Sequence, residues 1–420
     1  MAQLITSRCL ILVSVLCSLT TVANAEPDEQ ALGKAQGYPV GTYEGNWFAM
    51  PYRVGSWSAL DKVPGISTTP VPRAATPSPL PKAPNPPGIG YLHRNVSYTL
   101  DDYLERRRIT GLLILKDGTI VAERYRYDRT ESARFVSFSM AKSVTSLLIG
   151  IAVSRGAIAS LDDVASKYVK ELADSPYGGT TVRHLLRMSS GLSFSERYDG
   201  RDDVARLSRS VSLGHPSVIS ILRSVTDRHA PAGTKFVYAS AETEVLGRVL
   251  TAATGRSMAV LTSEWLWQPM GAESDAFWRT GQDGQEVAFA YFNATLRDWG
   301  RLGLLLAKDG EVDHQQIIPR DFLLDATDPA RQPAAFAPYR ATPYFGYGYQ
   351  FWINPLRERS FSMQGVHGQT LMVQPASGIV VVQTAVYAGA SGLQDPESYA
   401  ERGSFLMGVL KSLGGKTDGY

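Results

Sequence analysis

The apolar positions of the chain predict a β-hairpin and then a helix at the start of its globular part. Apolar runs at residues 112–115 and 120–122 flank the turn sequence Asp117-Gly118, a combination typical of two antiparallel strands. Between residues 144 and 151 the apolar side chains repeat at helical spacing instead. We therefore expect strand, turn, strand and helix in this order.

The middle of the chain has a different pattern from its end. From about residue 155 to 335 the pattern is mostly helical with long loops, and strand signals return only afterwards. Asp395-Pro396 resembles a helix N-cap followed by proline in the first turn, which predicts a terminal helix through Leu410. The late strand signals lie at residues 347–353, 371–373 and 379–382.

Strands at both ends of the globular part, with helices between them, define the predicted architecture. We expect an α/β fold with an antiparallel sheet that is built from both chain ends and flanked by helices, and an inserted, mostly helical domain. The α/β domain should comprise residues 98–155 and 336–420, and the helical domain residues 156–335.

Residues 1–25 have the pattern of a secretory signal peptide. Arg8 is their only charge, an apolar stretch follows it, and Ala23-Asn24-Ala25 matches the small-x-small cleavage pattern. Leu16 before Cys17 disfavours lipoprotein processing, which requires a small residue there. Cleavage after Ala25 would give a periplasmic or secreted protein without a membrane anchor.

Residues 26–97 should form a proline-rich N-terminal extension. Nine of the 24 prolines fall between Pro64 and Pro87, and such a run forms a linker or a strap over the surface rather than a helix or central strand. The segment before it contains six aromatic residues between Tyr38 and Trp57 that could pack against the main body.

Composition excludes some classes of function. The 420 residues include 42 basic and 40 acidic side chains, for a net charge of +2, so nothing indicates a nucleic-acid partner. The six histidines form no metal-binding motif, and both cysteines lie in the first twenty residues. We expect no metal and no cofactor, and the sequence leaves the oligomeric state open.

The first chemical signal is Ser139-Met140-Ala141-Lys142. Among eleven lysines only Lys142 has a serine three residues before it. At the start of the predicted helix, Ser139 would lie near the positive end of the helix dipole, and Lys142 would share its face. Apolar neighbours would desolvate the lysine and lower its pKa, as a general base requires. A capping serine and a solvated lysine are the alternative.

The second signal is Tyr238-Ala239-Ser240, which follows a Pro231-Ala232-Gly233 turn and precedes a helix. From a loop, both side chains can point into one cleft. There the tyrosine can transfer a proton, and the Ser240 hydroxyl can hold the lysine or the substrate.

Together these motifs resemble the serine β-lactamase and penicillin-binding protein superfamily, in particular its esterase branch related to class C β-lactamases. The flanking sequences are most similar to 6-aminohexanoate-dimer hydrolases. The resemblance covers roughly residues 98 to 412 and implies a β-lactamase-like fold. The similar strings are residues 137–143, 184–192, 194–198, 293–298 and 346–349.

The resemblance implies a role for each motif residue. Ser139 would be the acylated nucleophile and Lys142 its general base. Tyr238 would protonate the leaving group and later help to activate water. The dimer hydrolases also use a loop tyrosine near the cleft, and Tyr198 is the matching position. We interpret Glu196, Arg297 and Asp298 as structural charges on helix surfaces.

The third family motif, a Lys/His-Thr/Ser-Gly triplet on a strand beside the serine, is altered here. We align Met363-Gln364-Gly365 with it, which predicts that Gln364 and Gly365 bind substrate and that the Val366 and Ser139 N–H groups form the oxyanion hole. An alternative register places His367-Gly368-Gln369 there. His367 is a candidate for contact with the substrate, and a supporting or structural role is the alternative. Lys416-Thr417 lies too close to the C-terminus to match.

The altered triplet lacks the cation that reads the substrate carboxylate in β-lactamases and transpeptidases. The sequence therefore favours a secreted serine hydrolase that cleaves a small ester or linear amide through an acyl-enzyme. A β-lactamase or D,D-peptidase is one alternative, and a non-catalytic binding or sensor module on the same scaffold is another. The acyl and leaving groups stay undefined.

Overall fold

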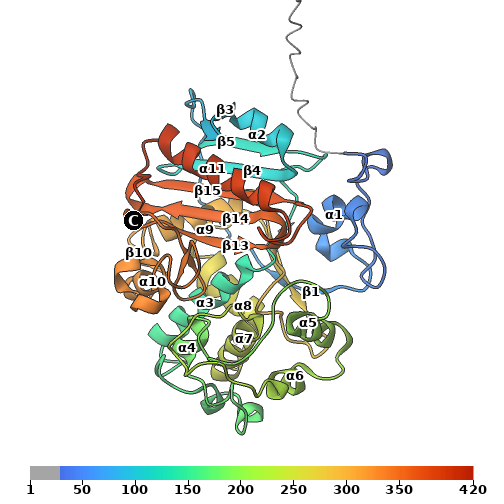
Figure 1. Ribbon diagram of the computed structural model, residues 1–420, viewed down its shortest axis with the longest axis vertical. Helices are drawn as coiled ribbons and strands as arrows, with labels where there is room; N and C mark the ends of the chain where they lie inside the picture. The colour runs from blue at the N-terminus through green and yellow to red at the C-terminus, as the bar shows by residue number, and fades with distance from the viewer. Residues whose placement is uncertain (1–28, 420) are drawn as a thin grey trace, which may run out of the picture.

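The computed structural model describes residues 29–419. The predicted signal peptide, residues 1–25, lies outside this range. Figure 1 shows a large sheet in the upper half of the molecule, a group of helices below it, and the N-terminal segment along one side.

The main sheet has seven antiparallel strands in the order β11-β12-β13-β14-β15-β4-β5. The two ends of the globular part meet inside this sheet, where β15 pairs with β4. The predicted antiparallel sheet built from both chain ends is thus confirmed. Its strands are β4 (Ile109–Lys116), β5 (Thr119–Tyr125), β11 (Gly346–Tyr347), β12 (Trp352–Ile353), β13 (Phe361–Gly365), β14 (Gln369–Gln374) and β15 (Ile379–Ala385).

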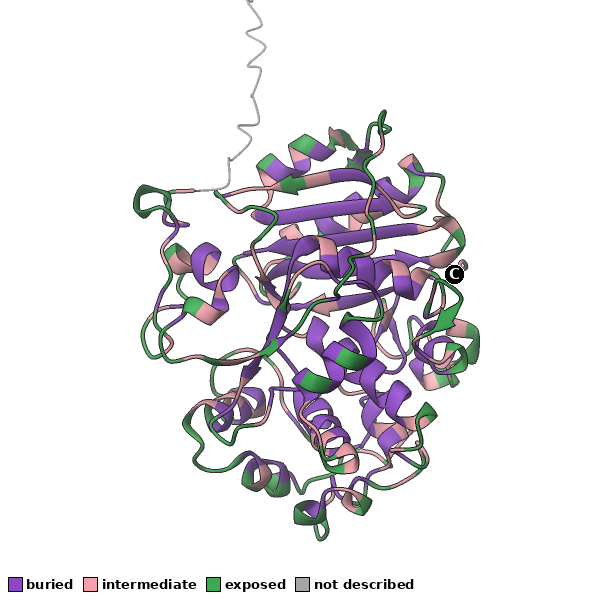
Figure 2. Ribbon diagram, turned by 180° about the vertical axis from the view of Figure 1, so that it is seen from behind, coloured by how far each residue is buried: buried purple, intermediate pink, exposed green. Residues whose placement is uncertain are grey.

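Alternating side chains of the central strands build two separate cores. Leu113 and Val382 point toward the core that contains α3 (Met140–Ser154) and α9 (Leu296–Ala307). Leu112 and Val381 point toward the opposite core, under α2 (Leu100–Arg106) and α11 (Pro396–Ser412). Because both faces are covered, β4 and β15 contain continuous apolar runs, at residues 112–115 and 379–382, rather than an alternating pattern. Figure 2 shows this buried centre.

A second, four-stranded sheet ties the N-terminal extension to the body. Its order is β1-β7-β8-β6, and β1, which belongs to the extension, pairs along its whole length with β7. The proline-rich extension is therefore an integrated part of the fold. The strands are β1 (Ser67–Val71), β6 (Phe135–Val136), β7 (Ala276–Thr280) and β8 (Phe292–Ala294).

The extension contributes two further pieces. Helix α1 (Met50–Trp57) and the aromatic residues around it pack against the body, as predicted. The hairpin β2 (Gly90–His93) and β3 (Val96–Thr99) packs beside α11, and a side chain at Gly408 of α11 would lie 2.3 Å from the Tyr91 Cβ.

The lower part of the molecule is mainly helical (Figure 1). Helix α7 runs against α3 and α4. Within the range assigned to the helical domain, α9 packs on the main sheet instead, and a small β-hairpin follows it. The remaining elements are α4 (Val182–Leu186), α5 (Asp203–Leu213), α6 (Val218–Ser224), α7 (Ser240–Thr254), α8 (Met258–Thr262), α10 (Arg320–Thr327), β9 (Glu311–Val312) and β10 (Gln315–Gln316).

Two local predictions have opposite outcomes. The Asp395 side chain caps α11 by accepting a hydrogen bond from the Ser398 N–H, with Pro396 in the first turn, as predicted. The prediction of one strand at 347–353 is wrong, because the chain reverses between β11 and β12. Gln350 at this reversal has a φ of 62° and donates its N–H to the Leu186 carbonyl. Among the helices of residues 29–419, none is long and apolar enough to cross a bilayer.

Candidate active site

Ser139 lies immediately before α3, and its hydroxyl does not cap the helix. It occupies the N-cap position, yet its side chain accepts no capping hydrogen bond. The Ser139 Oγ instead lies 3.0 Å from the Lys142 Nζ, one helical turn away. The geometry therefore favours the predicted nucleophile and base over a capping serine.

Lys142 is a buried amine without a carboxylate ion-pair partner among residues 29–419. It is 1% exposed, and its Nζ also donates to the Phe289 carbonyl at 2.9 Å. Burial lowers the Lys142 pKa from 10.5 to about 8, and the nearby Glu196 charge partly opposes this shift. An amine with this pKa is partly neutral near pH 7 and can accept a proton from serine.

The turn that carries Ser139 is tightly packed. Phe138 has a φ of 44°, in the left-handed region that a non-glycine residue adopts at a cost. Its ring packs edge-on against Trp57 and Phe48 of the N-terminal extension. Aromatic contacts from the extension thus support the residue next to the nucleophile.

Tyr238, the third residue of the predicted catalytic set, lies beside Lys142. It precedes α7, its ring stacks on Trp352 of β12, and its ring centroid lies 5.0 Å from the Lys142 Nζ. Burial raises the Tyr238 pKa well above 10, the Glu196 charge adds to this, and a hydrogen bond with Ser139 opposes it. Tyr238 is therefore protonated at neutral pH and can act as a proton donor.

Glu196 occupies a different position from the one predicted. It lies in the loop between α4 and α5 and lines the cavity at Ser139, rather than a helix surface. Its carboxylate accepts hydrogen bonds from the Ser240 N–H and Oγ, both at 2.8 Å, and from the Tyr198 hydroxyl at 2.9 Å. The structural interpretation of Glu196 thus misses an anion at the site. Ser240 faces this carboxylate and does not line the cavity, whereas Tyr198 does.

Strand β13 and the residue after it contribute to the wall of the same cavity. Gln364, Gly365 and Val366 all line the cavity with Ser139. A side chain at Gly365 would lie 2.3 Å from the Ser137 carbonyl oxygen, so only glycine lets β13 run this close to the nucleophile turn. These contacts correspond to the register with Met363-Gln364-Gly365 at the triplet.

His367 lies just beyond the cavity. It has a φ of 61°, and its ring lies against Trp57 and Phe138. Its Nδ1 donates to the Tyr387 carbonyl at 2.9 Å. Burial and the charge of Arg53 lower the His367 pKa to about 4, so His367 is neutral and supports the end of β13.

A cation from the terminal helix approaches the altered triplet. Arg402 of α11 donates to the Gln364 Oε1 at 3.0 Å and to the Thr370 Oγ1 at 2.8 Å. It is 6% exposed and lines the cavity. No carboxylate among residues 29–419 forms an ion pair with it. The sequence reasoning missed this arginine because it lies 38 positions from Gln364.

The cavity at Ser139 has a volume of about 1390 Å³. It extends from Ser139 and Tyr238 past β12 and β13 to α11 and the β2–β3 hairpin. Ligand pockets typically measure about 300–1,000 Å³, so this cavity can hold more than the two atoms of a scissile bond and their immediate substituents.

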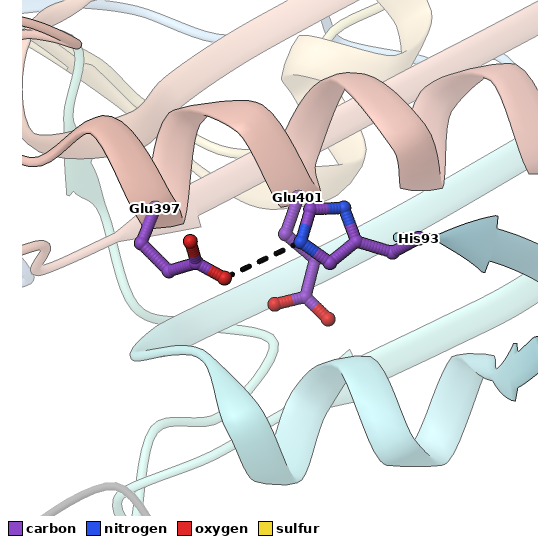
Figure 3. Close-up of side chains that lie close together, drawn as sticks. All are labelled: His93, Glu397 and Glu401. Atoms are coloured by element: carbon purple, nitrogen blue, oxygen red, sulfur yellow. Dashed lines mark hydrogen bonds and ion pairs between the residues drawn. The ribbon is translucent and has the colours of Figure 1, made fainter. Parts of the chain in front are cut away.

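The structure also contains one group of potential metal ligands among residues 29–419, away from Ser139. His93, Glu397 and Glu401 place donor atoms within 4.8 Å of one another (Figure 3). His93 lies 3.3 Å from Glu397, and both carboxylates are already paired with cations. We interpret the group as an ion-pair cluster that fastens β2 and α2 to α11. The cations are Arg94, Arg106 and Arg107.

Comparison with known proteins assigns the fold and chemistry to a family. The Beta-lactamase family model matches residues 96–400, which is more than half of the chain. The chain belongs to the Beta-lactamase family. Ser139, Lys142 and Tyr238 all lie within the matched range.

Individual relatives and solved structures extend this result. A 6-aminohexanoate-dimer hydrolase from Paenarthrobacter ureafaciens is 27% identical over 328 residues, which cover 75% of this chain and 81% of that protein. A Bacillus anthracis structure provisionally named a 6-aminohexanoate-dimer hydrolase has a TM-score of 0.78 at 24% identity and covers 88% of this chain and 96% of its own. A penicillin-binding protein homologue from Caulobacter crescentus has a TM-score of 0.55 at 17% identity, covering 73% and 93%. The last two, both under 25% identical, show the β-lactamase-like fold alone. The family match and the Paenarthrobacter relative together show that the chain is a serine hydrolase.

Proposed function

We propose that this serine hydrolase is a secreted enzyme that cleaves an ester or a linear amide through a Ser139 acyl-enzyme. The observation that carries the proposal is the 3.0 Å approach of the Lys142 Nζ to the Ser139 Oγ in a cavity wall. The amine there has its pKa lowered to about 8.

The acylation step follows from these groups. Neutral Lys142 takes the Ser139 proton as the Oγ attacks the substrate carbonyl carbon. The Ser139 and Val366 N–H groups hold the oxyanion that forms on the carbonyl oxygen. Tyr238 then gives its proton to the leaving alcohol or amine as the C–O or C–N bond breaks. The phenolate recovers a proton from Lys142, and water later releases the acyl group as an acid.

The surrounding residues divide between substrate contact and support. Tyr198, Gln364 and Gly365 lie in the cavity wall, where they can contact substrate. Ser240 and His367 do not line the cavity, and both are satisfied by neighbouring groups. We assign Ser240 to holding Glu196, and His367 to holding the end of β13.

The substrate class is drawn from the relatives. The Paenarthrobacter protein is named for hydrolysis of a 6-aminohexanoate dimer, a linear amide. We propose the same bond type, or the corresponding ester, for this chain. Activity on p-nitrophenyl esters and on 6-aminohexanoate oligomers, measured with one preparation, separates the two.

One observation favours a second candidate. Arg402 supplies a cation beside Gln364, at the altered triplet. In β-lactamases and transpeptidases the triplet cation binds the substrate carboxylate here. A carboxylated substrate, such as a β-lactam or a D,D-peptide, therefore has a possible partner. Nitrocefin turnover by the wild type that falls at least tenfold in Arg402→Gln would support this candidate, and no turnover would dismiss it.

The experiment for the main proposal is labelling with a fluorophosphonate probe. We expect one adduct, on Ser139, and none in Ser139→Ala, which should also lose hydrolysis. Thr145, a buried hydroxyl on the same helix that donates to the Ala288 carbonyl, provides a control: Thr145→Val should still be labelled. An adduct elsewhere, or full activity in Ser139→Ala, would overturn the assignment.

A further inference from the structure

The cavity continues well beyond the reacting groups, and its far part belongs to α11. Tyr399, Gly403, Leu406 and Leu410 line it. Their spacing of four, three and four residues places them along one side of the helix. From Tyr399 to Lys411 the lining extends for roughly 18 Å at about 1.5 Å per residue.

Most of the side chains along this part are apolar. Leu356 and Met372 line it from the sheet, and Tyr91 and Leu92 line it from the β2–β3 hairpin. Buried Arg402 is already bonded to Gln364 and Thr370. Between Arg402 and the exposed Lys411 at the other end of the lining, the far part therefore offers a ligand mainly apolar surface, which it can remove from water.

The rim of the cavity carries apolar side chains in contact with water. Leu393 is 96% exposed and Leu92 is 59% exposed, and both are cavity-lining residues. An isolated exposed leucine needs no explanation, but two at the edge of one apolar cavity would be covered by a chain lying in it.

We propose that this part of the cavity, which we call the α11 groove, binds a linear, mainly methylene chain of the substrate. The proposal rests on the proposed function, because it makes the α11 groove the extension of the Ser139 site. The preferred substrates are then esters or amides with an unbranched apolar chain on one side of the scissile bond. Because the α11 groove and Ser139 line one cavity, a chain in the groove can belong to the molecule whose scissile bond lies at Ser139, which favours a substrate over an unrelated ligand.

Gly403 offers a direct test of the α11 groove. A Cβ built at Gly403 meets no atom within 4 Å, whereas one at Gly408 would collide with Tyr91. Gly403→Trp should therefore fill the α11 groove without displacing the helix. Leu213→Trp, at the exposed end of α5 and outside the cavity, is the matched control.

The assay uses two ester series, since either side of the scissile bond could carry the chain. One varies the acyl group from acetate to dodecanoate in p-nitrophenyl esters, and the other varies the alcohol from ethyl to dodecyl in acetate esters. For the wild type we expect kcat/KM to rise in one series by at least about tenfold, since each buried methylene can contribute about fourfold. Gly403→Trp should abolish this rise while leaving the shortest ester within about threefold.

A second variant guards against misfolding of the first. Leu92→Ser changes an exposed rim side chain and should lower the rate on dodecyl or dodecanoyl substrates several-fold, with the short esters unaffected. A flat chain-length profile in both series, or a profile that Gly403→Trp and Leu92→Ser leave unchanged, would overturn the proposal. Hydrolysis that persists in Ser139→Ala would instead overturn the nucleophile assignment, so the two failures are distinguishable.

Discussion

The lowered pKa of Lys142 predicts how acylation depends on pH. Neutral Lys142 is the form that accepts the Ser139 proton, so the acylation rate should follow its fraction. With a pKa of about 8, that fraction is about one tenth at pH 7 and about nine tenths at pH 9. An exposed lysine with a pKa of 10.5 would be neutral to only about one part in 3,000 at pH 7, so burial increases the active form there ~300-fold.

Glu196 gives this prediction a direction that can be tested by mutation. Its charge raises the Lys142 pKa, so Glu196→Gln should lower that pKa further and move the rising limb of the pH profile to lower pH. The amide oxygen can still accept a hydrogen bond from the Ser240 N–H. Asp199, an exposed carboxylate in the same loop that pairs with Arg197, provides the control Asp199→Asn, which should leave the profile unchanged.

The assay is stopped-flow acylation with a p-nitrophenyl ester between pH 6 and 10, in which the burst rate reports the chemical step. We expect about a tenfold rise from pH 7 to the plateau, with a midpoint near 8. A rate independent of pH over this range, or a midpoint above 10, would show that Lys142 does not act as the titrating base. A shift of the limb to higher pH in Glu196→Gln would contradict the electrostatic argument.

Four further outcomes are expected. Lys142→Arg should lose most acylation although it keeps the charge, because a guanidinium stays protonated at neutral pH; near wild-type turnover would make Lys142 a point charge. Tyr238→Phe should reduce amide hydrolysis by about 10²–10⁴-fold and hydrolysis of an activated p-nitrophenyl ester less, which a matched ester and amide pair compares; equal losses would assign Tyr238 to a step common to both. Gly365→Val should reduce kcat by ~10²–10³-fold, as loss of an oxyanion donor does, because its side chain would collide with the Ser137 carbonyl; wild-type kcat would remove Val366 from the oxyanion hole. N-terminal sequencing of the exported protein should begin at Glu26, and an acylated Cys17 would refute this.

Sequence patterns identified the central sheet because its strands are buried on both faces. Continuous apolar runs such as residues 112–115 and 379–382 are typical of strands that are covered on both faces. The prediction of one strand at 347–353 is wrong because the aromatic residues of this segment belong to two short strands around a reversal. The reversal is held by the hydrogen bond from the Gln350 N–H to the Leu186 carbonyl, in a distant part of the chain. Local propensity carries no information about such a contact.

Site residues that are close together in the sequence could be predicted from it, whereas those brought together only by folding could not. Ser139 and Lys142 share one helical turn, so their spacing alone brings them together. Glu196 and Arg402 reach the site from a loop and from the terminal helix, and nothing in their neighbouring residues marks them. The environment of Glu196 arises only when α7 places the Ser240 N–H against its carboxylate.

The pairing of β4 with β15 has a consequence for the synthesis of the protein. Lys116 lies opposite Ile379, so more than 260 residues must be made after Lys116 before this inner pair of the sheet can form. Contacts this distant in sequence are slow to form and leave apolar strands uncovered until the partner arrives. Helix α3 needs the same late strands for its packing, since β13 and β14 lie against it. A nascent or truncated chain that ends before β13 therefore carries Ser139 and Lys142 without a functional catalytic pocket, and it remains vulnerable to proteases and aggregation until the last tenth of the polypeptide has emerged.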